Sequence, residues 1–174
     1  LQYRGQAGGP GQGGVNGISD AADLMTLEGL PLFKPPYFRV SAIDMSAGSK
    51  LWMSPIGNGP RQHPLLRDLN LPSLGGDYHR GSVMVTKTLL FVSMSAMHSQ
   101  GVPQRAAWAE WADPDDELVL FYVFDKQSGN LLHTMKLDGF SAAAPMTYEY
   151  KGRQYLIIAT GSGLDSALVA LSLG

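Results

Sequence analysis

The sequence predicts an all-β chain built from short antiparallel strands. From Phe38 onward, nearly every apolar run is short, rich in β-branched or aromatic residues and bounded by Gly, Asn, Asp or Pro. Tight-turn signals recur between these runs, at 85–90, 128–130 and 151–153. In addition, one hairpin motif occurs twice. Together these observations favour successive β-hairpins over any helical architecture.

Roughly nine strands are expected, at 38–44, 49–55, 81–86, 89–94, 118–125, 130–137, 144–150, 153–160 and 167–173. Ahead of them, residues 5–17 are more than half glycine, and such a segment loses too much backbone entropy on ordering to form a regular element. Residues 19–29 could form one short helix, with Ser19 or Asp20 as its N-cap and Gly29 after its end. The chain therefore divides into a Gly-rich mobile segment, 1–28, with this short helix, and a β segment, 29–174.

The amino-acid composition excludes several classes of function and site. The chain has 174 residues, 44% of them hydrophobic, so it can bury a core. A formal net charge of −2 argues against nucleic-acid binding, and no apolar run reaches the roughly 20 residues of a membrane helix. The absence of cysteine excludes disulfides and thiolate metal sites but leaves the compartment open. Because the sequence starts at Leu1 and not Met, we expect an N-terminal part to be missing.

The repeated hairpin motif has a clear physical reading. "AIDMSAGSKLW" (42–52) aligns without gaps to "VFDKQSGNLLH" (123–133), which matches Asp44 to Asp125 and Gly48 to Gly129. The Asp carboxylate can accept hydrogen bonds from the turn that it opens, and the Gly can take the positive φ that closes the turn. Trp52, at the end of the first copy, is placed to fill space between neighbouring sheets, whereas the second copy has His133 there.

The first copy resembles the tryptophan-docking repeat of the quinoprotein dehydrogenases, eight-bladed β-propellers that bind pyrroloquinoline quinone. Further blocks follow in the order found near the end of membrane glucose dehydrogenase and its alcohol dehydrogenase relatives: "HPLLRDLNLPSLG", "SVMVTKTLLFVS", "YVFDKQSGNLL" and "APMTYEYKGRQYLIIATGSG". The last block is the most diagnostic. The resemblance covers about residues 29–174.

The resemblance implies a partial β-propeller, the closing blades of an eight-bladed quinoprotein propeller with antiparallel four-stranded blades. Residues 81–137 would form one complete blade, with partial blades on either side. The last blade would take its fourth strand from elsewhere, and in the family the N-terminal region supplies it. The long connections, 56–80, 95–117, 138–143 and 161–166, would then share one end of the propeller, which in the family bears the cofactor.

Candidate site residues come from that end. The resemblance places Arg80, Gly81 and Ser82 beside the cofactor. The alternative is that 56–80 is a solvated connection which Pro and Gly merely turn. A metal site built on His63 and His79 is disfavoured, because two histidines without a third close ligand are commonplace. We assign no catalytic base and no metal ligand in this segment, because the family's motifs for them have no match here.

The stretch 95–117 is longer than the corresponding connection in the family. Trp108 and Trp111 are three residues apart, so one helical face would carry both rings. The pair could seal this insertion onto the sheet, or it could form a lid or partner surface. The acidic run 113–117 lacks calcium-loop spacing and is typical of a solvated helix end.

The function implied by the resemblance is oxidation of an alcohol or sugar by a pyrroloquinoline-quinone-dependent dehydrogenase. In the family an Asp base takes the alcohol proton, Ca²⁺ polarises the quinone, and electrons pass to a membrane quinone or cytochrome. The expected location is periplasmic, with membrane association through the missing N-terminal region. One alternative is a non-catalytic quinoprotein-like propeller that acts as a binding or assembly scaffold. Another is a separate chain that completes its sheet with a second subunit, and unpaired edges predict that this chain alone is not a monodisperse monomer.

Overall fold

The computed structural model describes residues 26–76, 78–97, 111, 119–139, 141, 143–161 and 163–172, and strands dominate them. Two short 3₁₀ turns, η1 (Arg67–Leu69) and η4 (Gly163–Asp165), interrupt the strands. The all-β prediction is therefore confirmed. Within these residues no helix has the length and apolar character needed to cross a membrane.

Three antiparallel sheets make up the body of the molecule. The first pairs β3 (Arg39–Asp44) with β4 (Ser49–Pro55). The second has four strands in sequence order: β5 (Tyr78–Val85), β6 (Leu89–Met97), β7 (Val119–Asp125) and β8 (Leu131–Lys136). The third, β9 (Met146–Tyr150), β10 (Arg153–Thr160) and β11 (Ala167–Ser172), has β10 at its centre.

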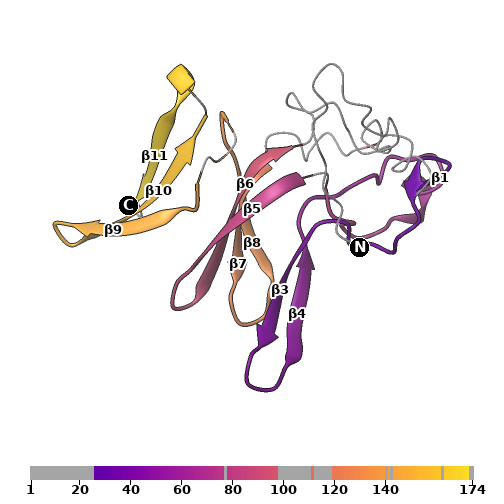
Figure 1. Ribbon diagram of the computed structural model, residues 1–174, viewed down its shortest axis with the longest axis horizontal. Coiled ribbons are helices and arrows are strands. Elements are labelled where there is room, and N and C mark those ends of the chain that lie inside the picture. The colour runs from indigo at the N-terminus through magenta and orange to yellow at the C-terminus, as the bar shows by residue number, and fades with distance from the viewer. Residues whose placement is uncertain are drawn as a thin grey trace, which may run out of the picture.

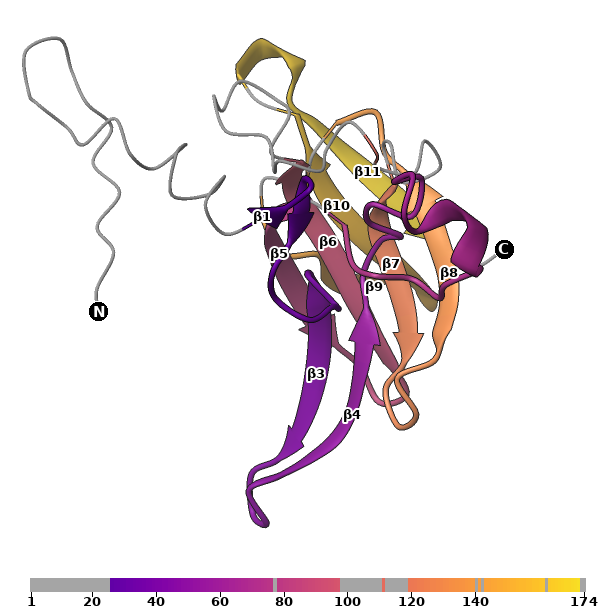
Figure 2. The ribbon, with the colours of Figure 1, turned by 90° about the vertical axis from the view of Figure 1, so that its right-hand side faces the viewer.

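The sheets stand side by side like blades of a fan. Figure 1 shows β3–β4, β5–β8 and β9–β11 in succession, and Figure 2 shows them one behind another. One four-stranded sheet flanked by two incomplete ones is the arrangement of a partial β-propeller, which confirms the predicted fold class.

The core lies between the sheets and alternates with strand period. In β7, Phe121 and Val123 line a groove that faces β9–β11, so the alternate residues Tyr122 and Phe124 point toward β3–β4. Phe121, Tyr122 and Phe124 are all buried, and Trp52 of β4 packs on the same cluster. The middle sheet is thus covered on both faces.

The two ends of the strands differ in the length of the connections that join them. Tight turns at 45–48, 86–88 and 126–130 join strands at the bottom of Figure 1, and the turn at 151–152 joins β9 to β10 at its left edge. The strand ends that the longer connections join all lie at the other end, called here the loop end. The described connection 56–76 starts and returns at this end, as expected, whereas most of 95–117 lies outside the described residues.

The predicted short helix is wrong at its C-terminal end, where residues 26–31 are not helical. They form a hairpin of β1 (Thr26–Leu27) and β2 (Leu30–Pro31), whose turn residues Glu28 and Gly29 have φ of 53° and 83°. Two consecutive left-handed residues cannot continue a right-handed helix. The rest of the predicted helix, 19–25, and the Gly-rich stretch 5–17 lie outside the described residues.

Both copies of the hairpin motif have the predicted turn geometry. The Asp44 carboxylate accepts hydrogen bonds from the backbone N–H groups of Ser46 and Ala47, at 2.8 and 3.1 Å. The Asp125 carboxylate does the same with Gln127 and Ser128, and also accepts from the Ser128 hydroxyl at 2.8 Å. These bonds lower the pKa of Asp125, the backbone bond from Ser128 most of all, because they stabilise the charged form.

Trp52 joins the first sheet to the second, as predicted. Its indole N–H donates to the carbonyl oxygen of Lys126 at 3.0 Å, and its ring lies on Gly129. A Cβ at Gly129 would come within 2.5 Å of the ring carbons, so a side chain there is excluded. The Ser54 hydroxyl also donates to the Gly129 carbonyl. The tryptophan of the first copy of the motif therefore packs on the turn of the second copy.

Candidate functional site at the loop end

The 56–76 loop leaves β4 and returns at the start of β5 through a fixed base. Three antiparallel backbone hydrogen bonds close it: Gly76 N–H to Ile56 at 2.7 Å, Gly75 to Gly57 at 3.0 Å, and Leu74 to Asn58 at 3.0 Å. Gly75 has φ +85°, and a Cβ there would lie 2.4 Å from the backbone nitrogen of Phe38. This glycine permits a close approach that no other residue could make.

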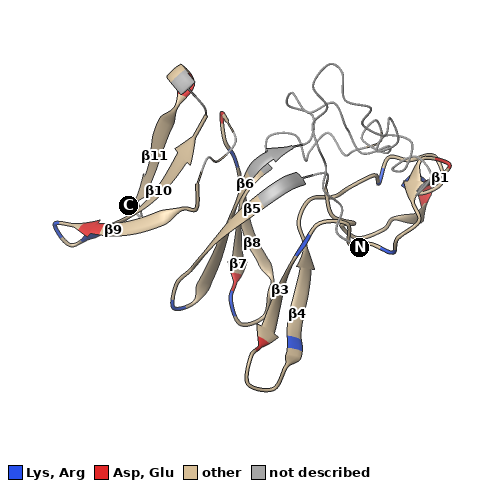
Figure 3. Cartoon of the chain, in the orientation of Figure 1, with Lys and Arg blue, Asp and Glu red and all other residues tan. Residues whose placement is uncertain are grey.

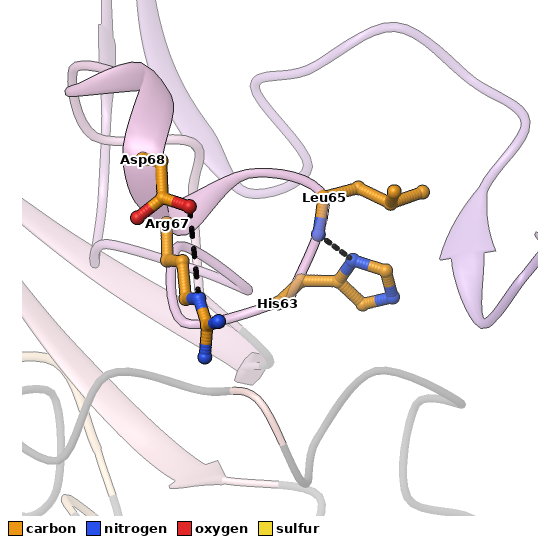
Figure 4. A network of polar contacts seen from close by, with 4 residues as sticks. All are labelled: His63, Leu65, Arg67 and Asp68. Carbon is orange, nitrogen blue, oxygen red and sulfur yellow. Dashed lines mark hydrogen bonds and ion pairs between the residues drawn. The ribbon is translucent and has the colours of Figure 1, made fainter.

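His63 holds the middle of this loop. Its Nδ1 accepts a hydrogen bond from the Leu65 N–H at 3.2 Å, drawn in Figure 4, and its Nε2 lies 2.9 Å from the carbonyl oxygen of Glu28. A backbone N–H only donates and a carbonyl only accepts, so these contacts assign the proton to Nε2. Both ring nitrogens are therefore occupied in a side chain that is 3% exposed.

The hydrogen bonds at Nδ1 and Nε2 leave His63 without a free ring nitrogen for a metal ion. The side chain of His79 lies outside the described residues. Within the described ranges, no group of three His, Asp or Glu side chains could hold a metal ion.

Trp111 contacts the same loop. Its ring meets His63 edge-on at a centroid distance of 4.4 Å and lies over Gly29, where a Cβ would come within 2.4 Å of it. Its carbonyl accepts from the Gln62 N–H at 3.3 Å. The described contacts of Trp111 are thus with a loop and the β1–β2 turn, whereas the sequence suggested packing on the sheet. Trp108 and the acidic run 113–117 lie outside the described residues.

The predicted cofactor residues Arg80, Gly81 and Ser82 lie in β5, at the loop end of the complete sheet. Gly81 pairs with Met94, and Ser82 pairs with Ser93 on the opposite face of the sheet. The Arg80 side chain lies outside the described residues.

The environment of Gly81 bears on the cofactor prediction. Gly81 is absent from the residues with positive φ, and a Cβ there would come no closer than 3.4 Å to the Met94 sulfur. The packing of the described chain therefore does not require glycine at this position. Gly81 is exposed and Ser82 is half-buried.

A buried polar cluster at the loop end was not predicted. Ser141 is 2% exposed, donates its N–H to the Met94 carbonyl at 2.9 Å and its hydroxyl to the Ala143 carbonyl at 2.7 Å, and bridges to Thr160. The Ser93 hydroxyl lies 3.5 Å from the same Ala143 oxygen. These residues fasten the connection before β9 to β6 and β10. The signal in the sequence was the polar residues Ser93 and Thr160 within otherwise largely apolar predicted strands, whereas Ser141 lies in a predicted connection.

Charge is dispersed over the described surface, as Figure 3 shows. The ion pair of Arg67 with Asp68, at 3.9 Å, joins two exposed side chains and contributes little stability. Burial raises the pKa of the Tyr37 hydroxyl, which therefore stays protonated and neutral at ordinary pH.

A groove of about 630 Å³ lies between the second and third sheets, but it reaches the turn end, where Thr86, Lys87 and Thr88 line it. His133 lines it too, at the position that Trp52 occupies in the first copy. The smaller imidazole leaves space where an indole fills the preceding interface. The groove therefore belongs to the packing between sheets and not to the loop end.

Comparison with known proteins fits this geometry. The family model described as "Glucose/ethanol/alcohol dehydrogenase, beta-propeller domain", with the family name PQQ, matches residues 4–156. The chain belongs to this family. It is 30% identical over 135 residues to the glycerol dehydrogenase large subunit of Gluconobacter thailandicus, which covers 76% of this chain and 15% of that protein.

Two quinoprotein relatives are also similar. Quinoprotein glucose dehydrogenase A of Acinetobacter calcoaceticus is 28% identical over 145 residues, which is 83% of this chain and 15% of that protein. Quinoprotein glucose dehydrogenase of Escherichia coli strain K12 is 25% identical over 139 residues, 76% and 14% of the two chains. The chain thus spans about one seventh of these relatives' length. The search of solved structures finds no significant match.

Proposed function

We propose that this chain is the C-terminal segment of a pyrroloquinoline-quinone-dependent dehydrogenase that oxidises an alcohol or a sugar. The single observation that carries the proposal is the match of the quinoprotein propeller family to residues 4–156. The similar proteins named glycerol dehydrogenase and glucose dehydrogenase favour a polyol or sugar as the substrate class.

The loop end is the proposed face for the cofactor. When bound, pyrroloquinoline quinone accepts a hydride from the carbon that is oxidised. From this chain, the Arg80 guanidinium would offset the cofactor's negative charge, and the Ser82 hydroxyl would hydrogen-bond to one of its oxygens. Gly81 would allow the backbone to approach closely, in agreement with the absence of any packing reason for glycine there.

The remaining chemistry is proposed to come from outside this segment. An Asp general base and Ca²⁺ would be supplied by other blades, since neither is assigned to a residue of this chain. A membrane quinone or cytochrome is the proposed electron acceptor, and the periplasm is the proposed location.

The test uses the full product of the gene that encodes this chain. The purified protein is incubated with pyrroloquinoline quinone and Ca²⁺ and assayed with an artificial dye acceptor, with glycerol, ethanol and glucose as substrates. We expect dye reduction that needs both the quinone and one of these substrates. A correctly folded protein that does not bind the quinone would instead favour the non-catalytic scaffold.

A further inference from the structure

Two serine hydroxyls of the second sheet face the third sheet near the loop end. Ser82 of β5 pairs with Ser93 of β6, and Ser93 pairs with Phe121 of β7. Directly paired residues share a face of their sheet, and Phe121 lines the groove that faces β9–β11. The side chains of Ser82 and Ser93 therefore point toward the third sheet.

Thr160 and Ser141 meet these serines from the other side. Thr160 lies four residues after Leu156 in β10, and Leu156 lines the same groove, so strand periodicity points Thr160 toward the second sheet. Ser141 pairs with Thr160 and shares its face. The hydroxyls of Ser141 and Ser93 also lie at one acceptor, the Ala143 carbonyl oxygen, at 2.7 and 3.5 Å.

The hydrogen bonding of these buried hydroxyls is incomplete. Ser93 is 0% exposed and Thr160 is 6% exposed. The 3.5 Å distance from Ser93 to the Ala143 oxygen is well beyond the usual hydroxyl hydrogen bond of about 2.7–2.8 Å. Within the described part of the chain, the hydroxyls of Thr160 and Ser82 make no hydrogen bond. A buried hydroxyl without a partner is costly, and native proteins satisfy such groups with ordered water.

We propose that Ser93 and Thr160 are positioning residues, which hold a buried water molecule that also bonds to the Ser82 hydroxyl. A buried water makes about three hydrogen bonds, and these three hydroxyls provide three groups with unused capacity. When the water donates to the Ser82 oxygen, the single proton of Ser82 stays available for an oxygen of the cofactor. The role of the water at the cofactor rests on the proposed function, whereas the water itself rests on the geometry of the hydroxyls.

The first test concerns the water and needs no cofactor. Thr160→Val keeps the shape of the side chain and removes its hydroxyl. In the quinone-free full gene product, we expect it to lower the melting temperature by about 2 °C or more. Thr134→Val, the same change at an exposed position of β8, is the matched control and should have little effect. An unchanged or higher melting temperature for Thr160→Val would show a hydroxyl without a partner and would overturn the proposal.

The second test measures the affinity of the same quinone-free protein for pyrroloquinoline quinone, by titration calorimetry in the presence of Ca²⁺. Thr160→Val and Ser93→Ala should each weaken binding roughly fivefold, because the Ser82 hydroxyl loses its orientation. Thr160→Ser should restore most of the affinity, since it keeps the hydroxyl. An effect of Thr160→Ser as large as that of Thr160→Val would contradict a role for the hydroxyl.

A double-mutant cycle then tests whether Thr160 acts through Ser82. In a Ser82→Ala background, Thr160→Val should weaken quinone binding no further. Equal weakening in the two backgrounds would overturn the positioning role. If Ser82→Ala leaves the affinity unchanged, Ser82 does not contact the cofactor and the positioning role fails, while a lowered melting temperature of Thr160→Val would still support the water.

Discussion

At the residue scale, the fold depends on a few side chains with fixed roles. The turn roles of four residues could be predicted from the sequence, because their spacing is typical of this turn: Asp44, Asp125, Gly48 and Gly129. The contact of Trp52 with Gly129 required the structure, since the two residues are far apart in the chain and belong to different sheets. The role of His63 was also hidden, because both of its partners are backbone groups.

Trp52→Ala should destabilise the chain by about 3 kcal/mol, through the lost ring packing and the lost hydrogen bond to the Lys126 carbonyl. Trp52→Phe should cost about 1 kcal/mol, since it removes the hydrogen bond and keeps an aromatic ring. Urea unfolding followed by circular dichroism measures both. The neighbouring exposed Leu51→Ala is the control, and a Trp52→Ala effect no larger than that of Leu51→Ala would contradict the docking role.

Asp125→Asn should make the free energy of unfolding less dependent on pH in the acidic range. The folded state holds the Asp125 pKa below its unfolded value, so the ionised carboxylate stabilises the fold above that value and loses this effect as pH falls through the folded pKa. Urea midpoints should therefore favour the wild type at pH 7, with the difference shrinking below about pH 4. A difference that stays constant from pH 7 to pH 3 would refute the assignment.

At the element scale, turns were predicted better than connections. The expected strands match the observed ones to within a few residues, because period-2 patterning and turn residues are local properties. The helix at 19–29 failed over 26–29, where Glu28 and Gly29 take left-handed conformations. The 56–76 loop looked like a solvated connection, yet backbone pairing at its base and the buried His63 give it a defined structure.

His63→Ala should loosen this loop while leaving the sheets intact. Loss of two hydrogen bonds and the Trp111 contact would reduce the local opening free energy by about 1.4 kcal/mol, which predicts roughly tenfold faster trypsin cleavage after Arg61 and Arg67. Cleavage after Lys151, in a distant turn, is the internal control. Unchanged cleavage at Arg61 and Arg67 would show that His63 does not hold the loop.

At the scale of the whole molecule, the order of the strands and their pairing follow from the sequence, whereas the covering of each face does not. The first and third sheets expose apolar side chains on their outward faces, among them Ile43 and Met53 at one side and Met146, Tyr148 and Leu168 at the other. The placement of Arg80, Gly81 and Ser82 beside a cofactor came from resemblance, and it stays a prediction because the ligand itself completes the site.

The outward faces predict self-association of the 174-residue chain in isolation. Light scattering at increasing protein concentration should show a rising mean mass. Added glycerol should not change this mass. A single monomeric species across the concentration range, with cooperative unfolding in calorimetry, would contradict this expectation.

The most direct test of the account is hydrogen–deuterium exchange of the full gene product with and without pyrroloquinoline quinone. The account predicts slower exchange on binding in peptides that contain 56–76 and 78–82, with no change at the opposite turns 86–88 and 126–130. Protection at those turns, or along the groove beside His133, would place the quinone at the wrong end of the sheets and contradict the account.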